Sequence, residues 1–231
     1  MNPVLTPEQL TNLRQLDACT LANAIESFHA RLRNEGFVDR TVHCMFPKLP
    51  PMLGYAATIK VRGSFPAFAG PPFVESTDWW DYIQSLPAPR VAVVQDASER
   101  LGVGSLIGLV HANILRALNC VGVVTNGVIR NMPAAEQIGL QLFAGGVSVS
   151  HAYVHIIEFG QPVVIGGLKI QSGDLLHGDL HGAQTIPLDL ATRIPLVAAK
   201  IKAQDQELVN LCQAKDFSLK KLRAAISKLN R

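Results

Sequence analysis

Two short runs of apolar residues, 91–94 and 121–124, constrain the fold of this chain more than any other feature. Each run is short, apolar throughout and bounded by polar or turn-forming residues, which predicts a buried strand. The first run ends near Asp96, and the second stops at the turn signal Asn126-Gly127. A helical pattern at 105–119 lies between the two strands. Helices that alternate with strands in this way predict a mixed α/β fold.

Other segments carry start, stop and turn signals. Thr6-Pro7-Glu8-Gln9 predicts a helix start, because the Thr6 and Gln9 side chains can form a capping box around Pro7. Residues 55–61 alternate as a half-buried strand does, and Thr77-Asp78 can cap a short helix. The remaining expectations are a helix at about 20–32 that stops at Gly36, a proline-rich loop at 47–51, irregular structure at 63–73, strands at 140–143, 163–165, 168–170 and 185–186, and a closing helix at about 188–211.

The composition indicates one large domain over residues 1–231. Hydrophobic residues make up 48% of the chain and charged residues 17%, below the roughly 25% typical of soluble domains. The chain can therefore bury a sizeable core, and sister subunits are expected to cover some of its surface. No internal repeat, linker or low-complexity segment divides it.

The C-terminal residues 215–231 carry the only concentration of basic charge, and their apolar residues recur at helical spacing. An amphipathic helix that packs on the domain with a solvated basic face is favoured over a nucleic-acid or membrane patch. The net charge of +3 is too small to predict nucleic-acid binding.

Four scattered cysteines form no CxxC pair, so they predict neither a zinc knuckle nor a redox motif. The N-terminus has no signal-peptide pattern, and no apolar run reaches the roughly 18 residues that a membrane-spanning helix needs. These features predict a cytoplasmic protein with reduced thiols and no membrane partner.

The segment 104–131 is the best candidate for a ligand site. The predicted helix start offers free backbone N–H groups at Gly108, Leu109, Val110 and His111, which favour an anion. The following strand brings Arg130 to its carboxyl end, where α/β folds bind ligands. A guanidinium facing a helix start predicts a carboxylate clamp. The alternative is a surface arginine paired with an acidic neighbour.

The sequence GVVTNGVIRN at 122–131 resembles a motif of the family of 4-hydroxy-4-methyl-2-oxoglutarate aldolases and regulators of ribonuclease E activity A. The resemblance extends in order to DACTLANA at 17–24, GYAAT at 54–58, the strand at 90–96 and SGDLLHGDLHGAQTIP at 172–187. Together these pieces cover most of the chain.

The resemblance implies a swivelling-type ββα fold, with mixed sheets or a partial barrel flanked by helices, and a homotrimer or hexamer with sites between subunits. It also implies a lyase that acts on 2-oxo acids, either as an aldolase or as an oxaloacetate decarboxylase. Arg130 would hold the substrate carboxylate. The next residue would hold Mg²⁺ or Mn²⁺, which stabilises an enolate as a Lewis acid.

Three positions that are acidic in the family carry asparagine here, namely Asn23, Asn126 and Asn131. Ala134 stands where the family often has a further acid. Hard divalent ions prefer charged oxygen ligands. Asn131 is therefore a weakened metal ligand, and the Mg²⁺ affinity is expected to be lower than with an acid at this position.

Histidines offer two other candidate clusters. His151 and His155 are four residues apart, a spacing that can share a metal on a helix, but their context is strand-like. His177 and His181 flank two aspartates, yet the surrounding glycines favour hairpin turns over a metal site. Trp79 and Trp80 are expected in the core or at a subunit contact.

Two functions therefore stay open. One is a 2-oxo acid lyase with Arg130 as the carboxylate anchor. The other is a non-catalytic regulator on the same trimeric scaffold, which would bind a protein partner.

Overall fold

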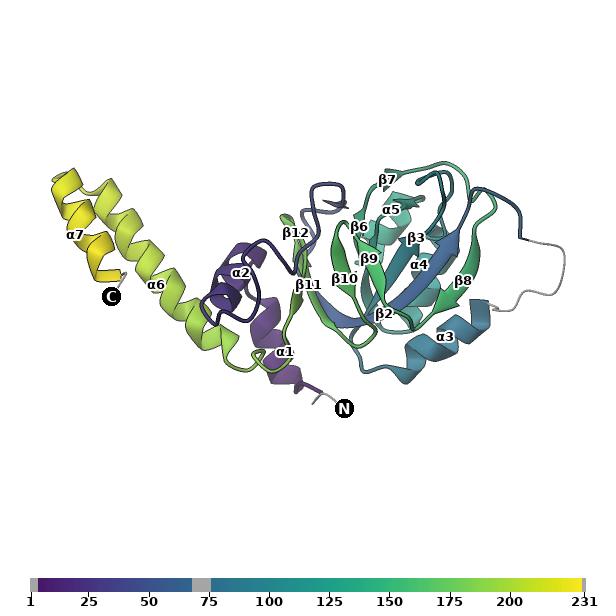
Figure 1. Ribbon diagram of the computed structural model, residues 1–231, viewed down its shortest axis with the longest axis horizontal. Coiled ribbons are helices and arrows are strands. Elements are labelled where there is room, and N and C mark those ends of the chain that lie inside the picture. The colour runs from purple at the N-terminus through teal and green to yellow at the C-terminus, as the bar shows by residue number, and fades with distance from the viewer. Residues whose placement is uncertain (1–3, 68–75, 230–231) are drawn as a thin grey trace.

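The computed structural model describes residues 4–67 and 76–229, and its elements form a mixed α/β fold (Figure 1). In chain order the elements are α1 (Pro7–Arg14), α2 (Ala18–Glu26), β1 (His43–Cys44), β2 (Met52–Arg62), α3 (Ser76–Ser85), β3 (Arg90–Asp96), α4 (Leu109–Ala117), β4 (Cys120–Thr125), β5 (Val128–Ile129), α5 (Met132–Gln137), β6 (Gln141–Ala144), β7 (Gly146–Val147), β8 (His155–Phe159), β9 (Val163–Ile165), β10 (Leu168–Ile170), β11 (Leu175–Asp179), β12 (Gly182–Ile186), α6 (Ile194–Gln213) and α7 (Leu219–Leu229).

One large sheet has the strand order β1-β6-β4-β3-β2-β11-β12, and β8 pairs with the end of β2. The central strands β2, β3, β4 and β6 are parallel, whereas β1, β8, β11 and β12 pair antiparallel with their neighbours. Two small sheets, β9–β10 and β5–β7, complete the strands of the described residues. These mixed sheets, flanked by helices, have the fold class that the sequence predicts.

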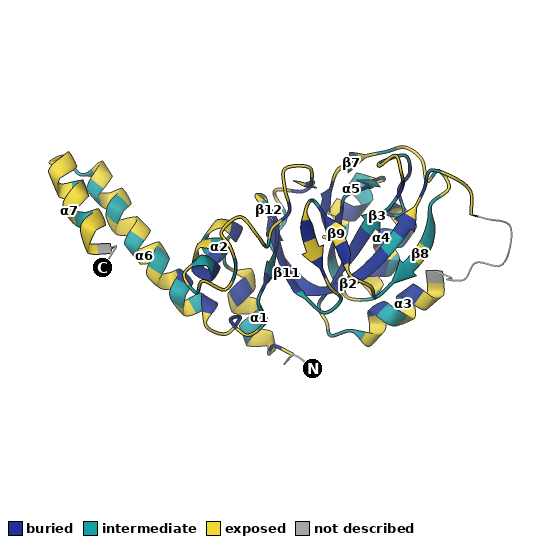
Figure 2. Cartoon of the chain, viewed as in Figure 1, coloured by how far each residue is buried: buried dark blue, intermediate teal, exposed yellow. Residues whose placement is uncertain are grey.

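Both faces of the central strands are covered. On one face, Ile59 and Val94 pack with Trp79 of α3 and Leu115 of α4. The β9–β10 hairpin covers the other face. Strand β2 is consequently buried along nearly its whole length (Figure 2). The prediction of a half-buried strand at 55–61 is wrong, because helices cover one face of β2 and the hairpin covers the other.

A separate core joins α1, α2 and the first turns of α6 to the β11–β12 end of the sheet. Leu21 and Ile25 of α2 pack there with Tyr55 of β2 and Ile194 of α6. Figure 2 shows that α6 becomes more exposed toward its C-terminal end and that α7 lies beside it, away from the sheet. The helix expected at 215–231 therefore exists, but it packs on α6 and not on the body of the domain. The 20-residue α6 is about 30 Å long, which carries α7 away from the sheet.

Several predicted boundaries shift. Helix α2 ends at Glu26 instead of extending to Leu32, because His29 adopts a left-handed φ of 53° that a helix cannot include. The helix expected from Ser105 begins at Leu109. The closing helix begins at Ile194 and not at 188, since residues 188–193 form turns before a proline that suits a helix start.

The segment around α3 is described in part. Helix α3 begins at Ser76, so Thr77-Asp78 lies in its first turn and does not cap it. Residues 63–67 are irregular as predicted, and the remainder of the 63–73 segment falls partly outside the described residues.

Other local predictions are confirmed. The capping box at Thr6 forms in both directions, and the buried strands at 91–94 and 121–124 lie within β3 and β4. The four cysteines are free. No helix in the described parts of the chain has the length and hydropathy needed to cross a membrane.

Candidate functional site

The parallel strands β3 and β4 end side by side, and an amide side chain joins their ends. The Asp96 N–H donates to Asn126 Oδ1 at 2.8 Å, and Asn126 Nδ2 donates back to the Asp96 carbonyl at 3.0 Å. The Asp96 carboxylate accepts from the N–H groups of Ser98 at 2.9 Å and Gly102 at 3.1 Å. These four bonds fix the start of the 97–108 loop at the carboxyl edge of the sheet.

The 97–108 loop leads into α4, whose first turn consists of Leu109, Val110 and His111. Gly108 is the N-cap in an extended conformation, and no side chain caps this end of the helix. The N–H groups of the first turn consequently have no acceptor within the helix. They also carry the positive end of the helix dipole, which favours an anion.

Arg130 lies directly against this helix start. Its backbone N–H donates to the Ile107 carbonyl at 3.0 Å. A Cβ atom placed on Gly108 would lie 3.0 Å from Arg130 Nε, so glycine leaves the room that the guanidinium occupies. The sequence predicted that Arg130 would face this helix start, and it does, although it follows the short strand β5 and not the predicted strand at 121–124.

The Arg130 guanidinium is only partly engaged. Its Nη1 donates to the Val149 carbonyl at 3.2 Å, and its Nε is buried without a hydrogen-bond partner. None of the ion pairs among residues 4–67 and 76–229 involves Arg130. Among the described residues, Arg130 is therefore not a surface arginine neutralised by an acidic neighbour, which was the alternative prediction. A cation with spare donors beside free N–H groups is able to hold a carboxylate.

Asn131, the candidate metal ligand, follows Arg130 at the N-cap of α5. It adopts a left-handed conformation with φ 55° and ψ 39°, and its side chain makes no capping bond. Its Oδ1 atom lies close to Gly108. Within the described residues there is no group of three or more His, Cys, Asp or Glu side chains that could hold a metal. A neutral amide without carboxylate neighbours fits a hard divalent ion poorly.

The other two asparagines that replace family acids have different surroundings. The Asn126 side chain forms hydrogen bonds to the backbone of Asp96 in β3 through both its oxygen and its nitrogen. Asn23 is exposed on α2, which packs on α6, β11 and β12 and lies apart from α4 and α5 (Figure 1). A single chain thus brings Gly108, Arg130 and Asn131 together but leaves Asn23 elsewhere.

The His111 side chain is part of the neighbourhood that sequence reasoning missed, since only its backbone N–H was expected to matter. Its ring makes an edge contact with Trp80 of α3 at 6.4 Å between centroids, and its Nε2 is buried without a hydrogen-bond partner. Burial lowers the pKa of His111, and the nearby His151 lowers it further. Trp79 is fully buried in the core, as expected.

Residues 148–154 form a loop at the same site, and no pattern in the sequence predicted this position. Besides the Val149 carbonyl at Arg130, the His151 carbonyl lies close over Gly104, where a Cβ atom would come within 2.2 Å of it. His155 lies in β8, and its Nδ1 is 2.8 Å from the Tyr153 carbonyl. Only the close approach at Gly104 could have been suspected from the sequence, because a glycine is required there.

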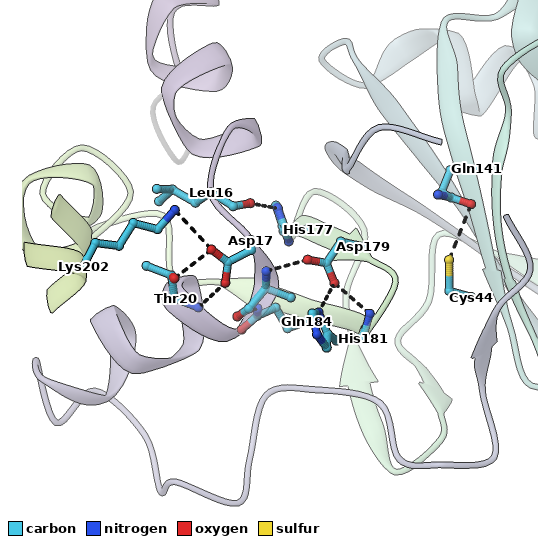
Figure 3. A network of polar contacts seen from close by, with 11 residues as sticks. Leu16, Asp17, Thr20, Cys44, Gln141, His177, Asp179, His181, Gln184 and Lys202 are labelled. Atoms are coloured by element: carbon cyan, nitrogen blue, oxygen red, sulfur yellow. Dashed lines mark hydrogen bonds and ion pairs between the residues drawn. The ribbon is translucent and has the colours of Figure 1, made fainter. Parts of the chain in front are cut away.

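The second histidine cluster is structural. Asp179 ends β11 and accepts hydrogen bonds from the N–H groups of His181 and of Ala18, both at 2.8 Å. His177 is fully buried, and its Nε2 lies 2.9 Å from the Leu16 carbonyl. Figure 3 shows these side chains joining the start of α2 to the β11–β12 hairpin. The predicted hairpin turn is present between β11 and β12.

Known proteins share this chain's sequence pattern and its fold. The sequence profile of the RraA-like family, described as Aldolase/RraA, matches residues 18–184. A protein of Halalkalibacterium halodurans, provisionally named as a 4-hydroxy-4-methyl-2-oxoglutarate aldolase, is 24% identical over 169 residues. That match covers 71% of this chain and 80% of the relative.

Two crystal structures share the fold at low identity. One is an uncharacterized protein from Pseudomonas syringae pv. tomato, with a TM-score of 0.74 and 21% identity, covering 97% of this chain and 96% of that one. The other is Streptomyces coelicolor RraAS2, which its description calls an unusual member of a family of ribonuclease inhibitors. Its TM-score is 0.67 with 19% identity, covering 90% of this chain and 98% of that one.

Proposed function

This chain belongs to the RraA-like family of aldolases and RraA proteins, and from that premise we propose that it binds a small 2-oxo acid at Arg130 and acts on it as a carbon–carbon lyase. The family contains both aldolase-type and ribonuclease-inhibitor-type members, so membership alone does not choose between the two. The state of Arg130 supports the lyase. We also propose that the protein works in the cytoplasm, where its four free thiols would stay reduced.

The observation that carries the proposal is the free guanidinium at an uncapped helix start. Arg130 has a buried Nε without a partner and no ion pair among the described residues, and it lies against Gly108 at the start of α4. Unsatisfied buried donors cost about 1–3 kcal/mol each. A bound carboxylate would satisfy the guanidinium and the first-turn N–H groups together.

The proposed reaction breaks the bond between C3 and C4 of the substrate, one carbon away from the 2-oxo carbon. The electron pair of that bond forms a C2=C3 double bond and the carbonyl pair moves to the oxygen, which gives an enolate. Carbon dioxide leaves from oxaloacetate, whereas an aldol first gives its 4-hydroxyl proton to water and then releases a 2-oxo acid. A proton from water then adds to the enolate carbon and gives pyruvate. Arg130 and the α4 amides bind and orient the carboxylate throughout this sequence.

This site would bind a divalent ion only weakly. In the family pattern the residue at this position holds the ion through water, and the Asn131 carbonyl oxygen that replaces its carboxylate lacks charge. We propose that Mg²⁺ or Mn²⁺, if it binds, does so weakly, and that the protein's own donors do most of the ligand binding.

Subunits of a homotrimer or hexamer are proposed to cover the site. Leu109 and Val110 in the first turn of α4 are exposed, and so are Val149 and Tyr153 in the loop over Arg130. Apolar side chains gathered around a polar site are typical of an interface.

The second candidate is a regulator that binds a protein partner through this same surface. The replacement of family acids by asparagine favours it, because a regulator needs no metal. An assay of oxaloacetate decarboxylation with and without Mg²⁺ or Mn²⁺ separates the two. Turnover above the rate of an Arg130→Ala variant supports the lyase, and absence of turnover under both conditions favours the regulator.

A further inference from the structure

His111 contacts α3 and lies near the 148–154 loop, which also contacts Arg130. Its ring contacts Trp80 of α3 on one side, and His151 of the 148–154 loop is near enough to lower its pKa on another. The same loop supplies the carbonyl that accepts from Arg130 Nη1. His111 also belongs to the first turn of α4, which begins at the glycine in contact with Arg130.

Three polar atoms of these side chains are buried and have no hydrogen-bond partner among the residues that the structure describes. They are Nε2 of His111, Nε1 of Trp80 and Nε of Arg130. Such groups are rare in folded proteins because each leaves a desolvation cost uncompensated. Arg130 Nε and Trp80 Nε1 carry N–H groups that can only donate, and His111 Nε2 can also carry a proton. An anion at Arg130 would give its Nε an acceptor, and a protonated Nε2 of His111 needs an acceptor as well.

His111 is suited to donate as a neutral ring. Burial disfavours its charged form, the neighbouring His151 adds to that effect, and the positive end of the α4 dipole acts in the same direction. A neutral imidazole with its pKa lowered at a helix start can polarise a carbonyl oxygen without giving up its proton. A divalent metal would stabilise the same oxygen in a relative with a carboxylate after the arginine, whereas Asn131 fits such an ion poorly.

We propose that His111 is a further ligand-binding residue whose Nε2–H donates to the 2-oxo or enolate oxygen of an acid held by Arg130. This inference rests on the proposed function, because it needs a carboxylate at Arg130. Nε2 is buried in the free chain, so side chains around it have to shift when the ligand enters. The hydrogen bond stabilises negative charge on the oxygen, in the role that a metal has elsewhere.

The test uses oxalate, whose adjacent oxygens resemble the enolate of pyruvate, with the full-length protein and a chelator present. Calorimetry should show that His111→Ala weakens oxalate binding by at least about tenfold, the usual worth of a hydrogen bond to a charged group. His111→Gln keeps an N–H donor and should recover part of the loss. His43→Ala, a matched control at an exposed histidine of β1, should stay within about twofold of the unmodified protein.

A second readout does not depend on substituting a partly buried residue. Nitrogen-15 spectra of the unmodified protein should show a neutral His111 whose Nε2 signal moves on addition of oxalate, and the signal should not move in Arg130→Ala. If oxalate binds through Arg130 but the His111 signal and the His111→Ala affinity are unchanged, the His111 inference is wrong and the proposed function stands. If the unmodified protein fails to bind oxalate, both are wrong.

Discussion

Asn126 uses both ends of its amide to hold the ends of β3 and β4 together. Its oxygen accepts from the Asp96 N–H, and its nitrogen donates to the Asp96 carbonyl. A carboxylate at this position would keep the first bond but would face the carbonyl oxygen without a proton to share. The amide that replaces a family acid here therefore has a structural explanation.

Restoring the family acid at this position should destabilise the protein. Asn126→Asp loses one hydrogen bond and places a charge beside a carbonyl, so the free energy of unfolding should fall by about 1–3 kcal/mol. Urea denaturation measures the change. Asn23→Asp, an exposed position on α2, is the matched control and should alter stability by less than about 0.5 kcal/mol. Equal stabilities of the two variants would contradict the structural role of Asn126.

The opposite outcome is expected at Asn131, whose side chain makes no capping bond. Asn131→Asp returns a negative charge beside Arg130 and should tighten Mg²⁺ binding measured by calorimetry, because hard divalent ions prefer carboxylate oxygen. The unmodified protein should bind Mg²⁺ weakly. Tight Mg²⁺ binding before the substitution, or no gain after it, would refute the weakened metal site.

At the scale of elements, α2 is anchored at its N-cap. Asp17 accepts from the Thr20 N–H and hydroxyl and pairs with Lys202 of α6 at 3.2 Å (Figure 3). Burial by itself would raise the pKa of Asp17, but the bonds from Thr20 and the ion pair with Lys202 outweigh it and lower the pKa to about 2. This carboxylate thus links α2 to the root of the C-terminal arm, defined as α6 and α7.

The lowered pKa fixes the sign of a pH effect on stability. Because the folded pKa is below the unfolded value of 3.8, the contribution of Asp17 is present above pH 3.8 and is lost as the pH falls toward about 2. Asp17→Asn should flatten the fall in stability across that window when unfolding is followed by circular dichroism. Asp205→Asn, an exposed change on the same arm, should leave the profile as it is. A profile for Asp17→Asn that matches the unmodified protein would be evidence against this anchor.

The elements differ in how far the sequence could predict them. Strands β3 and β4 were predictable because their runs VAVV and VGVV are apolar throughout and therefore indicate buried strands. The burial of strand β2 was not predictable, because Thr58 and Lys60 are polar residues typical of a solvent-exposed face. In the structure Thr58 bonds to Ser172 and Lys60 pairs with Glu158. The end of α2 was also not predictable, because the residue with the left-handed backbone conformation is His29 and not a glycine.

For the site, the meeting of Arg130 with Gly108 followed from general rules about strand ends and helix starts. The roles of Asn126 and of the 148–154 loop did not, because both depend on partners distant along the chain. His111 was seen only as a backbone donor for a similar reason, since its ring environment depends on α3 and on that loop.

At the scale of the whole molecule, the arm stands out from the body. The family match ends at residue 184, before α6 begins, and the sheet with α3, α4 and α5 forms a unit apart from the arm (Figure 1). Exposed apolar side chains remain on the arm, among them Leu196, Val209 and Leu219. Exposed apolar side chains also surround Arg130, and apolar surface that gathers around a polar site is typical of an interface.

The assembly should therefore be larger than one chain. Light scattering at micromolar concentration is expected to give a mass of three or six chains, as the family resemblance implies. A mass of one chain at that concentration would remove the argument that neighbouring subunits cover the site at Arg130.

The central claim is that Arg130 anchors a small carboxylate, and calorimetry with oxalate or pyruvate tests it most directly. Charge-assisted hydrogen bonds contribute about 1.5–3 kcal/mol each, so Arg130→Ala should weaken binding at least about tenfold. Arg130→Lys should recover only part of the affinity, since an ammonium cannot form the bidentate contact. Arg40→Ala, at an exposed arginine, should bind like the unmodified protein, and the amide of pyruvate should bind poorly. If Arg130→Ala binds the acids within about twofold of the unmodified protein, Arg130 is not the anchor and the regulator becomes the better account.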